Sequence, residues 1–333
     1  MADETVRIVR FHQTGGPEVL QIDTLPLPEP GKGEVRLRVK AIGLNRAEVM
    51  FRMGKYLQQP TLPSKLGYEA SGTVEAVGEG VDKAWIGKTA STVPAFMANE
   101  YGVYGEVAIV PAHALAEYPA SLSLEQGTSI WMQYLTAYGA LVHFGNIAKG
   151  DFVVITAASS SVGIAAIEIA KAEGAISIAV TRTQAKRDEL KAAGADHVIV
   201  TDDEDLVARV NEITSDKGAR LVFDPIGGPI VQKLAAITAY QGIIFEYGAL
   251  SGDATPLPLF LALSKSLTFR GYTLFEINGV PEVRAKAERY VFDKLQSGAF
   301  KPIIAKTFTL DQIVEAHRYM ESNQQIGKIV VTV

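Results

Sequence analysis

The chain has 333 residues, a length that predicts two domains rather than one core. Apolar residues make up 47% and charged residues 21%, which is typical of a globular protein, and the net charge of −5 favours neither nucleic acid nor an anionic membrane as partner. Cysteine is absent, which excludes disulfides, thiolate nucleophiles, iron–sulfur clusters and sulfur-ligated zinc. The absence of cysteine does not fix the compartment, although it fits a cytoplasmic enzyme.

The first third of the chain is rich in short strands separated by Gly and Pro turns. Alternation is clearest in residues 34–42, where Val35, Leu37 and Val39 share one face and basic residues the other. Such strands predict a small barrel or a curled sheet. The predicted strands are Val6–Phe11, Val19–Asp23, Glu34–Ile42, Gly72–Val77 and Glu106–Val110.

The sequence pattern changes from strand-rich to alternating helix and strand at Ser123–Gln126. These residues have the pattern of a capping box, which opens a helix. Residues 127–148 lack formal charge but carry polar side chains, and they predict a buried helix rather than a membrane span. Helices and strands then alternate, which predicts a parallel, doubly wound sheet. The strands are Phe152–Ile155, Ala175–Val180, His197–Val200, Ala219–Phe223 and Gly242–Tyr247, and the helices are Val162–Glu173, Gln184–Ala193, Glu204–Thr214 and Val231–Ala239.

The stretch 151–182 organises this second part. A buried strand, a turn of small residues, an Ala-rich helix and a second strand follow one another there. This βαβ order places the N-terminus of a helix against a phosphate group. The three positions of the G-x-G-x-x-G fingerprint fall on Ala158, Ser160 and Gly163, so only the last is glycine. Ala and Ser fit such a turn where φ is negative, and an ordinary crossover without ligand is the alternative.

Hydroxyl groups in this turn add hydrogen-bond donors for a diphosphate. The residues expected to contact the cofactor here are Ser159, Ser160, Ser161, Val162 and Gly163.

The end of the second strand predicts which dinucleotide binds. NAD requires an acidic residue there for the ribose 2′-hydroxyl, whereas the chain has Thr181 and Arg182, followed by Lys186. Cations suit a 2′-phosphate, so the sequence predicts NADPH as cofactor. The alternative is that Arg182 and Lys186 form a solvated basic start of a helix.

Motifs spread over the whole chain resemble the medium-chain dehydrogenase/reductase superfamily, and most closely its zinc-free quinone oxidoreductase (zeta-crystallin-like) branch. The resemblance implies an α/β protein with a GroES-like, β-rich catalytic domain at 1–122 and 300–333 and a Rossmann domain at 123–299. It rests on residues 15–20 (GGPEVL), 43–48 (GLNRAE), 66–72 (LGYEASG), 135–138 (LTAY), 157–163 (AASSSVG) and 327–330 (GKIV).

The chain departs from the family pattern at the zinc ligands and at residues that bind the cofactor's 2′-phosphate. Zinc-binding members have Cys at the position of Asn45 and His at that of Tyr68, so the resemblance implies no metal. A Tyr and an Arg that help to hold the 2′-phosphate in quinone reductases fall on Thr201 and Asn323, which weakens the expectation of NADPH. Lys186 matches the family.

The resemblance also assigns roles in the site. Tyr56 lies in a Gly-x-Tyr loop and would be an acid or hydrogen-bond donor, unless it only packs a Pro-rich loop. Asn45 would line the substrate and nicotinamide-ribose side, with an Asx-turn as the alternative. Thr136 would meet the nicotinamide carboxamide, unless its hydroxyl bonds to its own helix backbone. The backbone of residues 248–250 (Gly248, Ala249 and Leu250) follows a Rossmann strand and would meet the nicotinamide.

These features predict a zinc-independent, NADPH-dependent reductase of quinones or other activated C=C acceptors. A 2-enoyl thioester reductase is an alternative, and an NADPH-binding regulatory or crystallin-like protein with little turnover is an alternative of another class. The resemblance further implies a homodimer formed through edge strands near residues 267–272.

Overall fold

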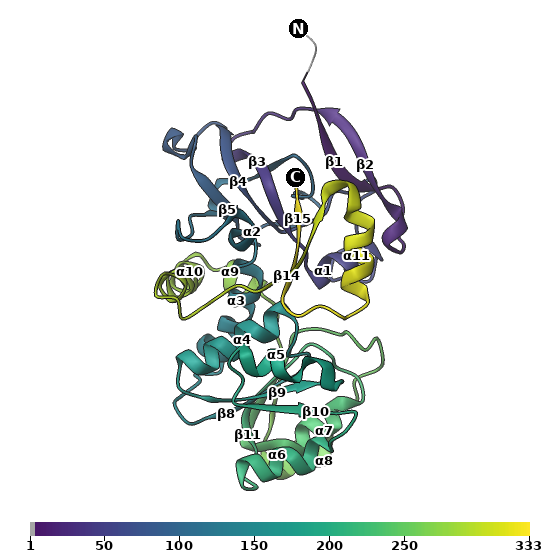
Figure 1. Cartoon of the computed structure of the whole chain (residues 1–333), viewed down its shortest axis with the longest axis vertical. Coiled ribbons are helices and arrows are strands. Elements are labelled where there is room, and N and C mark those ends of the chain that lie inside the picture. The colour runs from purple at the N-terminus through teal and green to yellow at the C-terminus, as the bar shows by residue number, and fades with distance from the viewer. Residues whose placement is uncertain (1–3) are drawn as a thin grey trace. The chain divides into compact units, whose positions relative to one another are not determined.

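A computed structural model describes residues 4–333. The chain folds into two compact units, one formed by residues up to 132 with 302–333 and the other by residues 133–301. The first is β-rich and the second is built on a parallel sheet covered by helices (Figure 1). The predicted combination of a GroES-like domain and a Rossmann domain is confirmed.

The first unit is organised around strand β3 (Glu34–Gly43), the long alternating strand that the sequence predicts. Val35, Leu37 and Val39 are buried as expected, and β3 pairs antiparallel with three neighbours. A separate antiparallel pair is formed by β1 (Thr5–Phe11) and β2 (Leu20–Pro26). The remaining strands of the larger sheet are β4 (Glu69–Val77), β5 (Thr89–Thr92), β6 (Val107–Pro111), β7 (Leu115–Ala116), β14 (Ile304–Thr309) and β15 (Lys328–Thr332).

The C-terminal segment completes this unit. Strand β15 pairs with β3, and Val330 faces Gly43 across the ladder, so residues from opposite ends of the sequence become neighbours. Helix α11 (Ile313–Glu321) packs on β14 and β15. The short helices α1 (Arg46–Arg52) and α2 (Leu124–Gly127) both begin with a capping box, and that of α2 is the one predicted at Ser123.

The second unit contains a six-stranded parallel sheet with the order β10-β9-β8-β11-β12-β13. All of its carboxyl ends therefore lie along one edge, where open sheets of this kind bind ligands. The strands are β8 (Phe152–Ile155), β9 (Ile176–Thr181), β10 (His197–Val200), β11 (Ala219–Asp224), β12 (Thr238–Glu246) and β13 (Thr268–Gly271).

Helices cover this sheet. A dry cluster of Val, Ile, Leu and Ala side chains joins the central strands to α6 and α7, which also pack on each other. The helices are α3 (Trp131–Tyr138), α4 (Ser161–Ala172), α5 (Arg187–Ala192), α6 (Leu206–Thr214), α7 (Ile230–Ile237), α8 (Leu259–Lys265), α9 (Phe275–Asn278) and α10 (Pro281–Gln296).

Not every segment follows the sequence prediction. The charge-free stretch 127–148 is not one helix, because α3 is followed by a π-helical turn over Gly139–Phe144. The sequence prediction omitted α10, the longest helix of the second unit.

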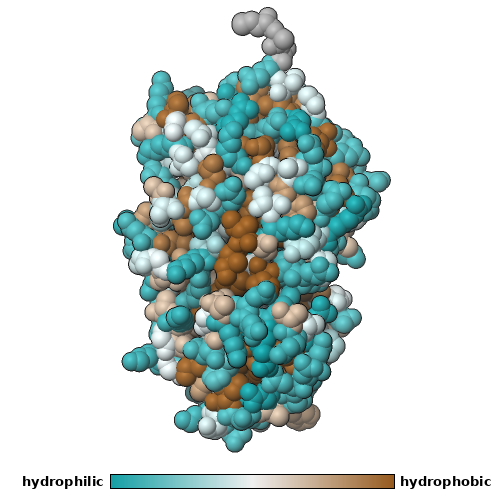
Figure 2. Space-filling model, in the orientation of Figure 1, coloured by the Kyte–Doolittle hydropathy of each residue, from teal (hydrophilic) through white to brown (hydrophobic). Residues whose placement is uncertain are grey.

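Hydrophilic residues cover most of the face seen in Figure 2, and apolar residues reach that face in separate groups. Among residues 4–333, no helix combines the length and the apolar character needed to cross a membrane.

Candidate functional site

The turn between β8 and α4 has the geometry of an anion-binding site. Ser160 is the N-cap of α4, with φ of −68°, and its hydroxyl oxygen accepts a hydrogen bond of 3.0 Å from the N–H of Gly163. A Cβ on Gly163 would lie 2.5 Å from the carbonyl oxygen of Ala158, so only glycine fits there. The left-handed position is Ala157, with φ of 45°. The negative φ expected for Ser160 is thus observed at the fingerprint's second position.

The first amides of α4 are free to bind a ligand. Ser161 and Val162 occupy the first turn of this 12-residue helix, where backbone N–H groups have no acceptor inside the helix. The helix dipole adds positive potential at the same place. The arrangement suits a phosphate group, as the sequence predicts.

Two cations mark the end of β9. Lys186 donates a hydrogen bond of 2.9 Å to the hydroxyl of Ser159, which ties this cation to the turn before α4. Partial burial, with a smaller effect of the neighbouring Arg182, lowers the pKa of Lys186. The Arg182 side chain is exposed and forms no ion pair with any described residue. Thr181 ends the strand, and its carbonyl accepts a hydrogen bond from the N–H of Thr201.

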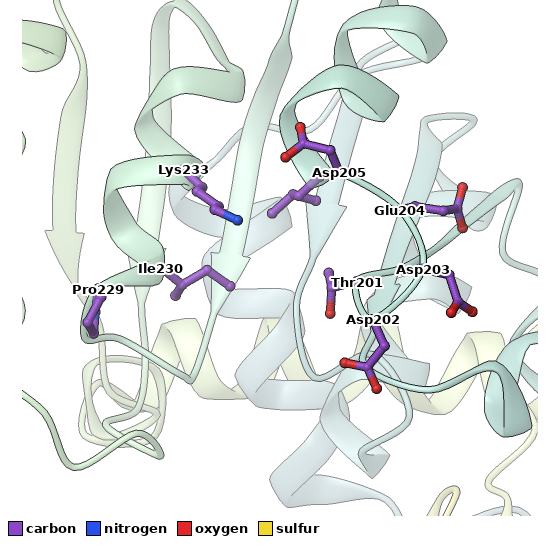
Figure 3. Close-up of a pocket in the computed structure, with 9 residues that line it drawn as sticks. Thr201, Asp202, Asp203, Glu204, Asp205, Pro229, Ile230 and Lys233 are labelled. Carbon is purple, nitrogen blue, oxygen red and sulfur yellow. The ribbon is translucent and has the colours of Figure 1, made fainter.

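A pocket of about 600 Å³ opens beside this end of the sheet (Figure 3). One wall is the acidic loop after β10, and the other is the first turn of α7, from which Ile230 and Lys233 extend toward that loop. The pocket combines apolar side chains with separate polar groups. It is lined by Thr201, Asp202, Asp203, Glu204, Asp205, Leu206, Pro229, Ile230 and Lys233.

Two of the four acidic residues in this loop, Glu204 and Asp205, form contacts within the protein. Glu204 forms ion pairs with Arg187 and Arg209. A hydrogen bond from the N–H of Val200, followed by these two cations, lowers the pKa of Glu204. Asp205 caps α6 by accepting a hydrogen bond from the N–H of Ala208. The exposed Asp202 and Asp203 therefore carry the negative charge that this wall offers to a ligand. Ile230 and Lys233 belong to no motif, so no pattern in the sequence predicts this pocket.

The segment after β12 lies close to the end of the neighbouring strand β11. Gly248 lies against Pro225, since a Cβ on Gly248 would be 2.6 Å from the carbonyl oxygen of Pro225. The N–H of Leu250 donates to the same carbonyl. Gly248, Ala249 and Leu250 are exposed at the carboxyl edge, as a backbone contact to a ligand requires, and Thr136 is almost fully buried on α3.

Polar side chains cross the carboxyl ends of three neighbouring strands. Thr156 donates to Asp224, and Asp224 is the register partner of Glu246 on β12. Burial and the adjacent Asp224 raise the pKa of Glu246 to about 8. Glu246 is therefore mostly a neutral carboxylic acid at pH 7.

Asn45 lies in a buried network of the first unit. Its side-chain oxygen accepts a hydrogen bond of 2.5 Å from the ammonium of Lys328, and its NH₂ group donates to Glu48 and Glu69. Lys328 also forms an ion pair with Glu69, and both side chains are 1% exposed. Lys328 and Glu69 stand 259 positions apart, so no local pattern in the sequence predicts their contact.

Glu48 connects this network to two tyrosines. It accepts hydrogen bonds from the N–H of Tyr68 and from the hydroxyl of Tyr104. Burial raises the pKa of Glu48, and the hydrogen bonds from Tyr104 and Asn45 offset this in part. Tyr56 is partly buried, and burial followed by the charge of Glu48 raises the pKa of its hydroxyl, so it is protonated at neutral pH.

Asn323 belongs to the first unit, where it follows α11. Its side-chain oxygen accepts a hydrogen bond of 3.0 Å from the guanidinium of Arg46. Within residues 4–333, no group of three or more His, Cys, Asp or Glu side chains is arranged to hold a metal ion.

Family models and known proteins agree with this architecture. Residues 31–120 match the alcohol dehydrogenase GroES-like domain, and residues 161–289 match the zinc-binding dehydrogenase domain. Despite the name of the second model, Asn45 and Tyr68 are unsuitable zinc ligands, and Asn45 is occupied by the ammonium of Lys328.

Relatives match over nearly the whole chain. Quinone oxidoreductase 1 of Escherichia coli is 32% identical over 96% of this chain and 97% of its own. A 2-haloacrylate reductase of Burkholderia is 30% identical over 96% and 97% of the two chains.

Solved structures give the same result. The structure of Escherichia coli quinone oxidoreductase complexed with NADPH has a TM-score of 0.91 at 31% identity and covers 98% of this chain and 100% of that one. An NAD-dependent alcohol dehydrogenase has a TM-score of 0.90 at 32% identity, with 98% and 99% covered. The chain therefore belongs to the medium-chain dehydrogenase/reductase superfamily of oxidoreductases, in its quinone oxidoreductase branch.

Proposed function

We propose that the chain is a zinc-independent, NADPH-dependent reductase that transfers hydride to a quinone or another activated C=C acceptor. The observation that carries this proposal is the pair Arg182 and Lys186 at the end of β9, with Lys186 bonded to Ser159. An acid would be needed there for an unphosphorylated ribose. Two cations beside a hydroxyl provide charge-assisted donors for a 2′-phosphate instead.

The acidic loop opposes this preference. Asp202 follows β10, and its N–H donates to the carbonyl of Arg182, so negative charge lies close to the two cations. Two features still favour NADPH. Arg182 has no ion-pair partner among the described residues, and Asp202 has a solvated carboxylate whose effect is screened.

The rest of the cofactor is assigned to the same unit. The amides of Ser161 and Val162 would hold the diphosphate, and the pocket along α7 would take the adenine ring between Leu206 and Ile230. Thr136 and the backbone at 248–250 would orient the nicotinamide. NADPH bound in this way supplies the hydride, and the protein supplies position and polarity.

The reduced acceptor needs a proton or a hydrogen bond on its developing oxyanion. Tyr56 is protonated at neutral pH and is proposed as that donor. Asn45 is proposed to shape the acceptor side, although its amide is already held by Lys328 and Glu69. The proposal assigns no step to a metal, and the side-chain oxygen of Asn45 accepts its hydrogen bond from the ammonium of Lys328.

A 2-enoyl thioester reductase remains the second candidate. Lys55 is exposed beside Tyr56 and makes no ion pair with a described residue, so it is a cation that a carrier phosphate could use. An NADPH-binding protein with little turnover is the candidate of another class, favoured by the absence of two of the three fingerprint glycines.

Oligomeric state and location belong to the same proposal. Strand β13 is an edge of its sheet, and α8 exposes Leu259, Phe260 and Leu263, with Phe260 86% exposed. A second copy pairing along β13 would cover both features, so we expect a homodimer. The charged and cysteine-free composition is consistent with the cytoplasm.

The test is a comparison of acceptors after cofactor binding has been measured. Purified protein is titrated with NADPH and NADH, and NADPH oxidation is then followed with a quinone, an enone and an enoyl thioester. Turnover with a quinone or enone supports the proposal. Turnover with the thioester alone selects the second candidate, and tight NADPH binding without turnover selects the third.

A further inference from the structure

The chain connects its two units at two places. It enters the second unit between Met132 and Gln133, inside helix α3, and leaves it between Lys301 and Pro302. Connections of this kind absorb the backbone changes when two compact units move during a reaction cycle. The groups that hold these connections are therefore candidates for a role in turnover.

One carboxyl group of the second unit binds both connections. Glu168 lies on α4, and only 8% of its surface is exposed. One of its oxygens accepts a hydrogen bond of 2.6 Å from the hydroxyl of Tyr134 on α3. The other accepts a hydrogen bond of 3.1 Å from the N–H of Lys301. Glu168 thus holds both the entering and the leaving segment against α4.

An aromatic stack joins the same two segments. The rings of Tyr134 and Phe300 have centres 4.6 Å apart and planes 5° from parallel, and both side chains are buried. Phe300 directly precedes Lys301 in the chain. The rings and the carboxyl group together fix where α3 and the end of the second unit lie on α4.

The carboxyl group is costly to bury. Burial raises the pKa of Glu168 to about 7, although the hydrogen bonds from Tyr134 and Lys301 and the charges of Lys301 and Lys171 oppose this. An apolar residue of similar volume would avoid the cost of burying a carboxylate. Stability alone therefore does not explain why a carboxyl group stands at this position.

Helix α3 is also bound at its first residues, within the first unit. The indole N–H of Trp131 donates a hydrogen bond of 2.8 Å to Ser91, and the N–H of Met132 donates one of 2.9 Å to Glu69. Glu69 also accepts a hydrogen bond from Asn45, which is proposed to shape the acceptor side. A shift of α3 relative to α4 would therefore move a hydrogen-bond partner of Asn45.

We propose that Glu168 is a positioning residue for hydride transfer, because it fixes both connections of the cofactor-binding unit on α4. The inference rests on the proposed function, which assigns the cofactor to the second unit and the acceptor to Tyr56 and Asn45 of the first. Hydride transfer then requires both connections to keep one geometry. A misplacement of about 1 Å between reacting groups costs about 100-fold in rate.

The kinetic test uses variants at Glu168 itself. Glu168→Leu keeps a similar volume and removes both hydrogen bonds, so kcat with a quinone should fall about 10- to 100-fold. The dissociation constant for NADPH should be unchanged, since the first turn of α4, Arg182 and Lys186 are untouched. Glu168→Gln should restore most of kcat, because an amide still accepts from Lys301 and bonds to the hydroxyl of Tyr134.

Hydrogen–deuterium exchange gives a readout that does not depend on activity. The amide of Lys301 should exchange about tenfold faster or more in Glu168→Leu, since its hydrogen bond to the carboxyl group is lost. Tyr134→Phe keeps the ring stack and removes one hydroxyl, so it should speed exchange in α3 and lower kcat less than Glu168→Leu does.

Tyr290→Phe is the matched control. Its ring also packs near Phe300, with centres 5.9 Å apart, but its hydroxyl donates to Glu173 and not to Glu168. This variant should leave both kcat and the exchange of Lys301 unchanged.

Several results would overturn the inference. Equal exchange of the Lys301 amide in wild type and Glu168→Leu would show that Glu168 does not hold this connection. Faster exchange with an unchanged kcat, or a loss of kcat matched by an equal loss of NADPH affinity, would show that the contacts serve folding alone. A wild type that reduces no acceptor would refute the proposed function, whereas the exchange of Lys301 would still show whether Glu168 holds the connection.

Discussion

The ammonium of Lys186 donates a hydrogen bond of 2.9 Å to the hydroxyl of Ser159. This contact joins the end of the first βαβ unit to its phosphate-binding turn, so the charge expected to select a 2′-phosphate and the turn expected to hold the diphosphate form one surface. Partial burial, followed by the charge of Arg182, lowers the pKa of Lys186, so the ammonium is partly withdrawn from water.

Replacing Arg182 or Lys186 by Ala should therefore reduce the affinity for NADPH about 10- to 100-fold, because each removes a charge-assisted hydrogen bond. The affinity for NADH should change little, since NADH lacks the 2′-phosphate. Fluorescence titration of both cofactors measures the effect. Lys191→Ala, at an exposed lysine on α5, is the matched control and should leave both affinities unchanged. Equal losses for the two cofactors would contradict the assignment.

Gly163→Ala should disrupt the turn before α4. The added Cβ would lie 2.5 Å from the carbonyl oxygen of Ala158, so the backbone must shift. The expected results are a loss of about 1–3 kcal/mol in the free energy of unfolding and at least tenfold weaker NADPH binding. Gly271→Ala is the control, because nothing lies within 4 Å of its Cβ position. If both variants bind NADPH like the wild type, close packing at the turn is not needed for the cofactor.

Glu246 should make stability depend on pH. Its pKa rises from 4.5 to about 8 on folding, so the folded chain keeps a proton that the unfolded chain releases. The stabilisation is complete below pH 4.5 and is lost as the pH rises toward 8. Burial also raises the pKa of Glu168, to about 7, which adds a similar slope at lower pH.

The effect of Glu246 is therefore best isolated between pH 7 and 8.5. Urea unfolding over this range should show stability falling in the wild type and a flatter curve in Glu246→Gln. Glu168→Gln is the companion variant and should flatten the curve mainly below pH 7. If stability changes with pH by the same amount in the wild type and in Glu246→Gln between pH 7 and 8.5, Glu246 is already ionised in the folded chain.

Removal of the Tyr56 hydroxyl should affect turnover and spare cofactor binding. Tyr56→Phe is expected to lower kcat about 100-fold, which is the lower end of the contribution of a positioned proton donor. The dissociation constant for NADPH should not change. Steady-state kinetics with a quinone and a binding titration measure the two effects. Tyr319→Phe provides a control in the same unit, and an unchanged kcat in Tyr56→Phe would assign Tyr56 to packing alone.

Lys328→Met should destabilise the first unit strongly. It removes the only ion-pair partner that the described residues offer to Glu69, and an unpaired buried charge costs about 3–5 kcal/mol. The double variant Lys328→Met with Glu69→Gln should recover part of this loss, because it removes the remaining charge as well. Urea unfolding of the three proteins measures the effect, and a double variant less stable than Lys328→Met would refute the coupling.

Local pattern predicted the Rossmann unit closely. The run Phe152–Ile155 is strand β8 residue for residue, and the small residues that follow form the turn and helix expected of them. Hydrophobic periodicity and glycine positions determine such features within a few residues of sequence. Helix α10 is hard to recognise because its N-cap is Val280 and its sequence is mostly polar. Its signals are weak: a proline at the first helical position and a narrow buried stripe of Ala287, Val291 and Leu295.

Sequence could not supply contacts between distant segments. Lys328 meets Asn45 only because β15 pairs with β3, and no local pattern predicts that pairing. The pocket along α7 is similar, since it joins Lys233 to a loop about 30 residues earlier in the chain.

The measurement that tests the central claim most directly is a paired titration of the purified protein with NADPH and NADH, followed by NADPH oxidation with a quinone. The account predicts binding of NADPH at least tenfold tighter than NADH, together with turnover. Equal affinity for the two cofactors, or binding of neither, would contradict the account, because Arg182 and Lys186 would then not bind a 2′-phosphate.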